Sequence, residues 1–180
     1  HVTCVARNEE KLKETVAEIE AAGGTAEFAI CDVANRESVD KVVDDVVEKF
    51  EKLDILVNNA TQLSDDLLEP KPFWEKPLSN LEMWDVGARS YYTASWHAAK
   101  MMTERGSGLI AFGSSFGASC YMHGPAYGAQ KAGLDKFAHD MEHDLRETGV
   151  ATVSIWMGPL VTERSLIAQK TNPEQYEGFI

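Results

Sequence analysis

Residues 109–156, LIAFGSSFGASCYMHGPAYGAQKAGLDKFAHDMEHDLRETGVATVSIW, decide the fold class of this chain. The segment begins with a short apolar run, Leu109–Phe112, and ends with another, Ala151–Trp156, and such runs are typical of buried strands. Between them, Ala126–Thr148 carries apolar side chains at helical spacing, namely Leu134, Phe137, Met141 and Leu145. A strand, a helix and a second strand in this order predict two parallel strands joined by a helical crossover.

The same alternation extends toward the N-terminus. We expect further strands at Val2–Ala6, Ala26–Cys31 and Asp54–Val57, and helices at Asn8–Ala22, at 35–50 behind an Asn35 cap, and at Asn80–Arg105. This pattern indicates an α/β fold, a doubly wound parallel sheet between two helical layers, in a single domain over residues 1–180. The segment Ala60–Leu78 contains Pro70, Pro72 and Pro77 without a sustained period, which predicts a long loop.

Composition excludes several classes of protein. The chain has 180 residues, 44% of them hydrophobic, and 17 basic against 29 acidic residues give a formal net charge of −12. This charge disfavours binding to nucleic acids and to anionic membrane surfaces. Cys4, Cys31 and Cys120 are odd in number and show no CxxC or Cys/His spacing. We therefore expect a reducing, intracellular and cytoplasmic environment and no structural zinc site.

Ligands of doubly wound sheets bind beyond the carboxyl ends of the strands, so the residues that follow the predicted strands are candidates for function. These residues are Arg7, Asp32, Asn58, Ser114 with Ser115, and the segment Met157–Thr162. We expect the functional site to be assembled from them.

The sharpest local feature is the pair Tyr127 and Lys131 at the start of the last long helix. Their spacing places the phenol and the ammonium on one helical face. A tyrosine has an ordinary pKa of ~10, and a fixed cation beside it, together with a charged cofactor, favours its ionised form. Such a pair can transfer a proton, although by itself it also fits a surface lysine beside a half-buried tyrosine.

Neighbouring motifs favour the first interpretation. Ser114 and Ser115 end the preceding strand, and Asn58-Asn59-Ala60 closes the strand before that. In this order the set resembles the short-chain dehydrogenase/reductase family over nearly the whole chain, which implies a Rossmann-type fold. Some stretches look closer still to the family branch called dehydrogenase/reductase member 1, namely 73–75, 83–85, 86–89 and 121–122.

The resemblance implies an oxidoreductase that interconverts a carbonyl and an alcohol on a small, largely apolar substrate by hydride transfer. Tyr127 would be the general acid or base, Lys131 would promote its ionisation and hold the nicotinamide ribose, and a serine would position the substrate oxygen. Matching from the strand side favours Ser115, which we choose, whereas counting back from Tyr127 favours Ser114. The resemblance also implies a homodimer or homotetramer built through the two long helices.

Arg7 indicates the cofactor. Folds that prefer NAD place an acid at this strand end, whereas an arginine accommodates the 2′-phosphate of NADP. The stretch Ala6-Arg7-Asn8 has no acid, so we predict NADP(H) over NAD(H). By resemblance, Asp32 and Val33 would flank the adenine, the backbone of Asn58 to Ala60 would line the adenosine, and Thr162 would meet the nicotinamide carboxamide.

Two departures from the family pattern motivate an alternative. The glycine-rich strand-turn-helix unit that receives the pyrophosphate is absent, and the chain ends before the family's last strand, so we expect a fragment that binds its cofactor poorly. Gly87 stands where many members have an asparagine that holds a proton-relay water. The alternative hypothesis is a non-catalytic binding or scaffold protein of the same fold.

A metal site is the remaining rival. His139, Glu142 and His143 match the His-x-x-Glu-His order of one metallopeptidase class. On a helical wheel, both imidazoles lie roughly opposite the apolar face of the helix. We therefore expect them to face solvent or a partner helix, without a catalytic metal.

Overall fold

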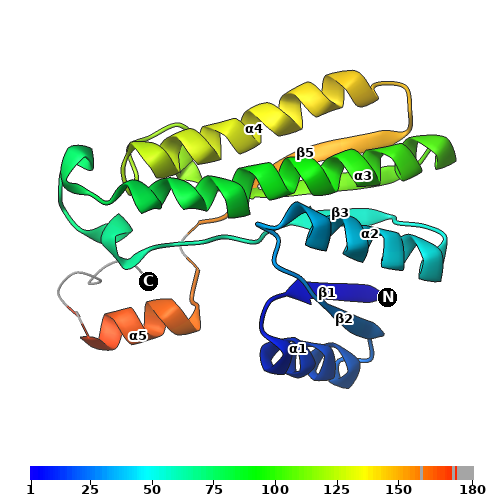
Figure 1. Cartoon of the computed structure of the whole chain (residues 1–180), viewed down its shortest axis with the longest axis horizontal. Coiled ribbons are helices and arrows are strands. Elements are labelled where there is room, and N and C mark those ends of the chain that lie inside the picture. Colours follow the sequence, from blue (N-terminus) through cyan, green and yellow to red (C-terminus); the bar gives the residue numbers. More distant parts are fainter. Residues whose placement is uncertain (159, 172, 174–180) are drawn as a thin grey trace.

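The chain is described by a computed structural model, which covers residues 1–158, 160–171 and 173. Strands and helices alternate along it as the sequence predicts (Figure 1). The strands are β1 (Val2–Ala6), β2 (Ala26–Ile30), β3 (Ile55–Asn58), β4 (Gly108–Ser114) and β5 (Val150–Trp156). The α-helices are α1 (Glu9–Ala21), α2 (Arg36–Phe50), α3 (Ser90–Arg105), α4 (Pro125–Leu145) and α5 (Glu163–Thr171).

The strands pair in parallel throughout. β1 pairs with β2, while β3, β4 and β5 pair in that order, with Ile55 level with Leu109 and Leu109 level with Ala151. The carboxyl ends of β3, β4 and β5 therefore meet at one edge. The predicted α/β class is confirmed. Within the described residues no ladder joins β1 to β3, so the strands form two parallel groups where the pattern predicts one sheet.

The main core lies between the three-stranded group and the helices α3 and α4, which cover one of its faces (Figure 1). Met102, Ile110, Phe112 and Leu134 are 0% exposed, and the ring of Tyr91 lies 6.3 Å from that of Phe112. Burial of each such side chain contributes about 1.5–3 kcal/mol. This core fixes the end of β4 against the start of α4.

The opposite face of the three-stranded group differs from the expectation that helices cover both faces. Side chains alternate between the faces of a strand, so Ile55, Val57 and Ile155 point away from α3 and α4. They are 55%, 64% and 48% exposed, which means that no described helix buries them. Among the described residues this face is therefore exposed, whereas the predicted α/β class, with parallel strands flanked by helices, is confirmed.

Asparagine caps begin the first two helices, and of these the sequence predicted the cap at Asn35. The Asn8 side chain accepts a hydrogen bond from the backbone N–H of Lys11, and that of Asn35 accepts one from Ser38, each at 3.0 Å. In Figure 1, β1 and β2 lie between α1 and α2. α2 packs against α3, where His97 Nε2 and Asp40 Oδ1 are 2.7 Å apart.

The predicted helix Asn80–Arg105 is not one continuous α-helix. It begins as a 3₁₀ turn at Leu78–Glu82 and passes through a π-helical turn at Asp85–Arg89 before α3. In the π-turn the N–H of Ser90 donates to the carbonyl of Asp85. Such turns commonly occur at functional sites, and this one faces the start of α4.

Two further segments carry structure that the pattern did not predict. The loop after β3 contains 3₁₀ turns at Asp65–Leu68 and Phe73–Glu75, and it buries Leu67 at 3% exposure. α5 has no strong apolar face, because Leu166 and Ile167 are both exposed. In the part of the chain that the structure describes, no helix is both long and apolar enough to cross a bilayer.

Candidate active site

Tyr127 and Lys131 lie on the first turns of α4 and are 8% and 6% exposed. Pro125 starts this helix, a position where its missing N–H costs no hydrogen bond. Lys131 Nζ is 5.6 Å from the centroid of the Tyr127 ring. The structure therefore places the ammonium beside the phenol, on one helical face, in a largely buried setting.

Ser115 follows β4 and brings its hydroxyl to the phenol. Ser115 Oγ and Tyr127 Oη are 2.9 Å apart, and Ser115 Oγ also accepts a hydrogen bond from the N–H of Gly117 at 3.2 Å. The Ser114 hydroxyl instead donates to the backbone carbonyl of Lys131 at 3.3 Å. Ser115 is therefore the serine that contacts the phenol, whereas Ser114 forms a hydrogen bond between the end of β4 and α4.

Lys131 is held at the same edge by the strand itself. Its Nζ donates to the carbonyl oxygen of Gly113 at 3.1 Å. Burial lowers the pKa of Lys131, and the nearby carboxylate of Asp135 opposes that shift. A partly desolvated ammonium interacts more strongly with a neighbouring oxygen than one in water does.

Gly117 allows the phenol to lie where it does. A Cβ at this position would lie 2.6 Å from a carbon of the Tyr127 ring. At Gly113, a Cβ would likewise come within 2.6 Å of Asn59 Oδ1. Both glycines thus permit close approach at the carboxyl edge of β4.

The candidate cofactor residues occupy strand ends but differ in their surroundings. Arg7 is exposed after β1, Asp32 is exposed after β2 and accepts a hydrogen bond from Ala34 N at 3.1 Å, and Val33 is half-buried. The Asn58 amide turns inward and donates to Ser95 Oγ at 3.1 Å, while the carbonyl of Ala60 accepts from Tyr91 Oη at 2.8 Å.

The described contacts of Thr162 do not include the other candidate cofactor residues. Its backbone N–H donates to Ser165 Oγ at 2.8 Å, and its hydroxyl accepts from the N–H of Ser165, which lies in the first turn of α5. The structure does not bring Thr162 into contact with Tyr127 or Lys131. Within the segment 157–162, Pro159 lies outside the described residues.

The sequence interpretation missed Gln130. This side chain is 1% exposed, and its Nε2 donates to the backbone carbonyl of Met83 at 2.5 Å. A Cβ at Gly87, in the π-turn, would lie 2.6 Å from the same nitrogen. The Gln130 amide therefore fills the space beside Gly87. The sequence feature that could have singled out Gln130 is its position directly before Lys131.

His139 and His143 lie outside this site. Their side chains are 79% and 73% exposed on the outer face of α4, as the helical wheel predicts. Across the described part of the chain, no group of three or more metal-binding side chains comes together.

Comparisons with known proteins identify the family of this chain. The profile of the short chain dehydrogenase family matches residues 1–173, so the chain belongs to this family. It is 36% identical over 177 residues to dehydrogenase/reductase SDR family member 1 of Mus musculus, covering 93% of this chain and 56% of that protein. The Homo sapiens protein of the same name is 38% identical over 164 residues, covering 87% and 51%. The chain thus spans about half the length of these relatives.

Solved structures share the fold. A metagenomic short-chain oxidoreductase in complex with NADP superposes with a TM-score of 0.80 at 26% identity, covering 99% of this chain and 80% of that one. L-Sorbose reductase from Gluconobacter frateurii, complexed with NADPH and L-sorbose, gives 0.85 at 25% identity and covers 99% and 69%. These similarities confirm the Rossmann-type α/β fold.

The contact between Gly87 and Gln130 is testable by a double-mutant cycle. In the wild-type background, Gly87→Ala should destabilise the protein by about 1–3 kcal/mol, because the new methyl group overlaps the buried amide. In a Gln130→Ala background the same change should be neutral or stabilise by up to about 1 kcal/mol, since alanine favours helix over glycine. Urea denaturation measures both, and equal effects in the two backgrounds would contradict the packing described.

Proposed function

We propose that this chain carries the catalytic centre of an NADP(H)-dependent oxidoreductase that interconverts a carbonyl and an alcohol on a small, largely apolar substrate. The observation that carries this proposal is the 2.9 Å contact of Ser115 Oγ with Tyr127 Oη, beside the buried ammonium of Lys131. Three groups with acid, hydrogen-bonding and cationic character converge there. Membership of the short chain dehydrogenase family supports the reaction class.

Each side chain has a distinct role in this proposal. Tyr127 Oη donates a proton to the carbonyl oxygen during reduction and accepts it from the alcohol in the reverse direction. Ser115 Oγ, already within hydrogen-bond distance of that phenol, positions the same oxygen. Lys131 stabilises the phenolate that remains, because its ammonium lies on the same face of α4.

The residues present fit a nicotinamide dinucleotide at the carboxyl edge of the strands. Lys131 presents an ammonium at that edge, and Asp32 and Arg7 stand exposed at the ends of β2 and β1. When bound, the nicotinamide supplies or accepts the hydride. Lys131 would hold the ribose hydroxyls, Asp32 and Val33 would flank the adenine, and the backbone of Asn58 to Ala60 would line the adenosine.

Preference for NADP(H) rests on Arg7. Its side chain is exposed at the end of β1, and among the described residues no carboxylate lies within ion-pair distance of its guanidinium. An unpaired guanidinium at this strand end suits a 2′-phosphate. Solved relatives carry either cofactor, NADP or NADPH in two of them and NADH in a 7α-hydroxysteroid dehydrogenase, so the choice depends on Arg7.

Tyr127→Phe tests the reaction. In the full-length protein, kcat for reduction of a panel of aldehydes and ketones should fall by about a hundred- to ten-thousandfold, because the proton donor is lost. Affinity for NADPH should stay within about threefold, since only a hydroxyl is removed. NADPH absorbance follows turnover and NADPH fluorescence follows binding, with Tyr92→Phe as the matched control. A wild-type protein that binds NADPH yet reduces no carbonyl would favour the scaffold alternative.

Arg7→Ala tests the cofactor preference. The dissociation constant for NADPH should rise by about ten- to a hundredfold, because a charge-assisted hydrogen bond to phosphate is lost. The constant for NADH should change by less than about twofold, since it lacks that phosphate. Arg146→Ala, at the far end of α4, is the control, and an equal loss for both cofactors would contradict the assignment.

We further propose that the protein is a homodimer or homotetramer built through α3 and α4. Tyr92 and Trp96 are 51% and 47% exposed on α3, and the Tyr92 ring lies 5.6 Å from that of Phe137 on α4. These aromatic rings form an exposed strip across the two helices. Such strips commonly mark protein–protein contacts.

Trp96→Glu should shift the oligomer toward monomer, because it places a charge within the apolar strip. Size-exclusion chromatography with light scattering measures the mass. Trp74→Glu, in the loop after β3, is the matched control and should leave the mass unchanged. A monomeric wild-type protein would refute the proposed interface.

A further inference from the structure

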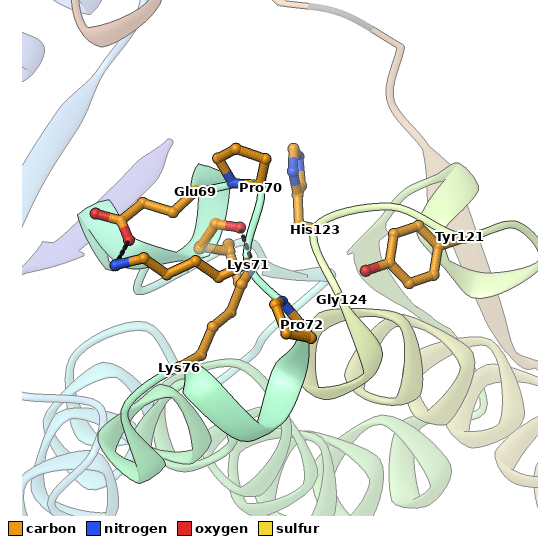
Figure 2. Close-up of a pocket in the computed structure, with 9 residues that line it drawn as sticks. Glu69, Pro70, Lys71, Pro72, Lys76, Tyr121, His123 and Gly124 are labelled. Carbon is orange, nitrogen blue, oxygen red and sulfur yellow. Dashed lines mark hydrogen bonds and ion pairs between the residues drawn. The ribbon is translucent and has the colours of Figure 1, made fainter.

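A cavity of about 430 Å³ is lined by residues that include Lys71, Lys76, Tyr121 and His123 (Figure 2). Its walls come from two segments, the loop 67–76 and the turn 121–124 that immediately precedes α4. Pockets of roughly 300–1,000 Å³ hold small organic ligands. The size and position suit a substrate whose reacting carbonyl points toward Tyr127.

Two wall residues connect this cavity to the candidate active site. The His123 ring lies 5.0 Å from the Tyr127 ring at an interplanar angle of 78°. Leu67 belongs to the same buried apolar cluster as Tyr127. His123 also adopts a left-handed backbone conformation, with φ of 58°, directly before Gly124. Non-glycine residues in this conformation are uncommon and concentrate at functional sites.

The two lysines in the cavity wall, Lys71 and Lys76, differ in their partners. Lys71 forms an ion pair with Glu69 at 2.7 Å, drawn as a dashed line in Figure 2. Lys76 differs, because its Nζ donates to the backbone carbonyl of Leu67 at 2.9 Å and forms no ion pair with a carboxylate whose side chain the structure describes. An ammonium has further N–H donors beyond that one bond. Lys76 is therefore the cation of this cavity that is available to a ligand.

The ammonium of Lys76 also lies close to the start of the catalytic helix. A Cβ built on Gly124 would be 3.8 Å from Lys76 Nζ. Burial lowers the pKa of His123, and the charge of Lys76 lowers it further, so the imidazole is neutral near pH 7 and can share in hydrogen bonding. In a chain with a net charge of −12, such a local cation is needed to attract an anion.

We propose that Lys76 determines substrate specificity, by binding the carboxylate of an otherwise apolar aldehyde or ketone in this cavity. This inference rests on the proposed carbonyl reduction at Tyr127. The apolar part of the substrate lies against Leu67, Pro70 and Pro72, while His123 separates the carboxylate end from the phenol. The substrate class is thus a small oxo-acid with one acidic group.

Matched substrates test the proposal in the full-length protein. With NADPH, 4-formylbenzoate should be reduced with a kcat/KM about ten- to a hundredfold higher than its methyl ester, because only the acid forms a charge-assisted bond. Lys76→Met should abolish that preference by raising KM for the acid alone. Lys76→Arg should retain it, and Lys136→Met is the control, since Lys136 is an exposed residue of α4 that lies outside the cavity and is paired with Asp140. An unchanged acid-to-ester ratio in Lys76→Met would overturn the assignment.

A binding measurement separates this inference from the proposed function. Titration of 4-formylbenzoate into the protein with NADP⁺ is followed by calorimetry and requires no turnover. About tenfold weaker binding to Lys76→Met than to the wild type supports the site even if no carbonyl is reduced, in which case only the proposed function fails. Equal binding to both proteins would refute the role of Lys76 whatever the activity.

Discussion

Burial of the Lys131 ammonium beside the Tyr127 phenol is the constraint on which the rest of the site depends. A charged group that leaves water must find polar partners, and here the carbonyl of Gly113 accepts its hydrogen bond. That carbonyl belongs to β4, so the position of the strand determines the position of the cation. The core of α3, α4 and the three-stranded group fixes this strand, since Phe112 and Leu134 are completely buried there.

Close packing around this pair explains why small residues occur where they do. The Tyr127 ring occupies the space that a Cβ at Gly117 would need, and the Gln130 amide occupies the space beside Gly87. The π-turn that contains Gly87 thus packs against the helix that carries Tyr127. Interiors packed this tightly transmit small changes, so residues outside the pair of Tyr127 and Lys131 influence its geometry.

The local charge at the candidate site is positive, whereas the chain as a whole is acidic. The chain is strongly acidic, yet cations lie at places suited to anionic groups: Arg7 beyond β1, Lys131 beside the phenol, and Lys76 in the neighbouring cavity. Parallel strands make this arrangement possible, because the loops that follow them gather at the same edge. Residues far apart in the sequence thereby contribute to adjoining sites.

Local patterns along the chain were enough to predict the alternation of strands and helices, the Asn35 cap and the shared face of Tyr127 and Lys131, because these depend on local spacing. The family resemblance added the strand-end serine. The sequence could not decide between Ser114 and Ser115 as the partner of the phenol, because both hydroxyls bond to α4 and only the packing of the end of β4 on that helix determines which one reaches Tyr127. It likewise could not predict the π-turn, the burial of Gln130 over Gly87, or the cavity beside His123, since each arises from contacts between segments distant in the chain.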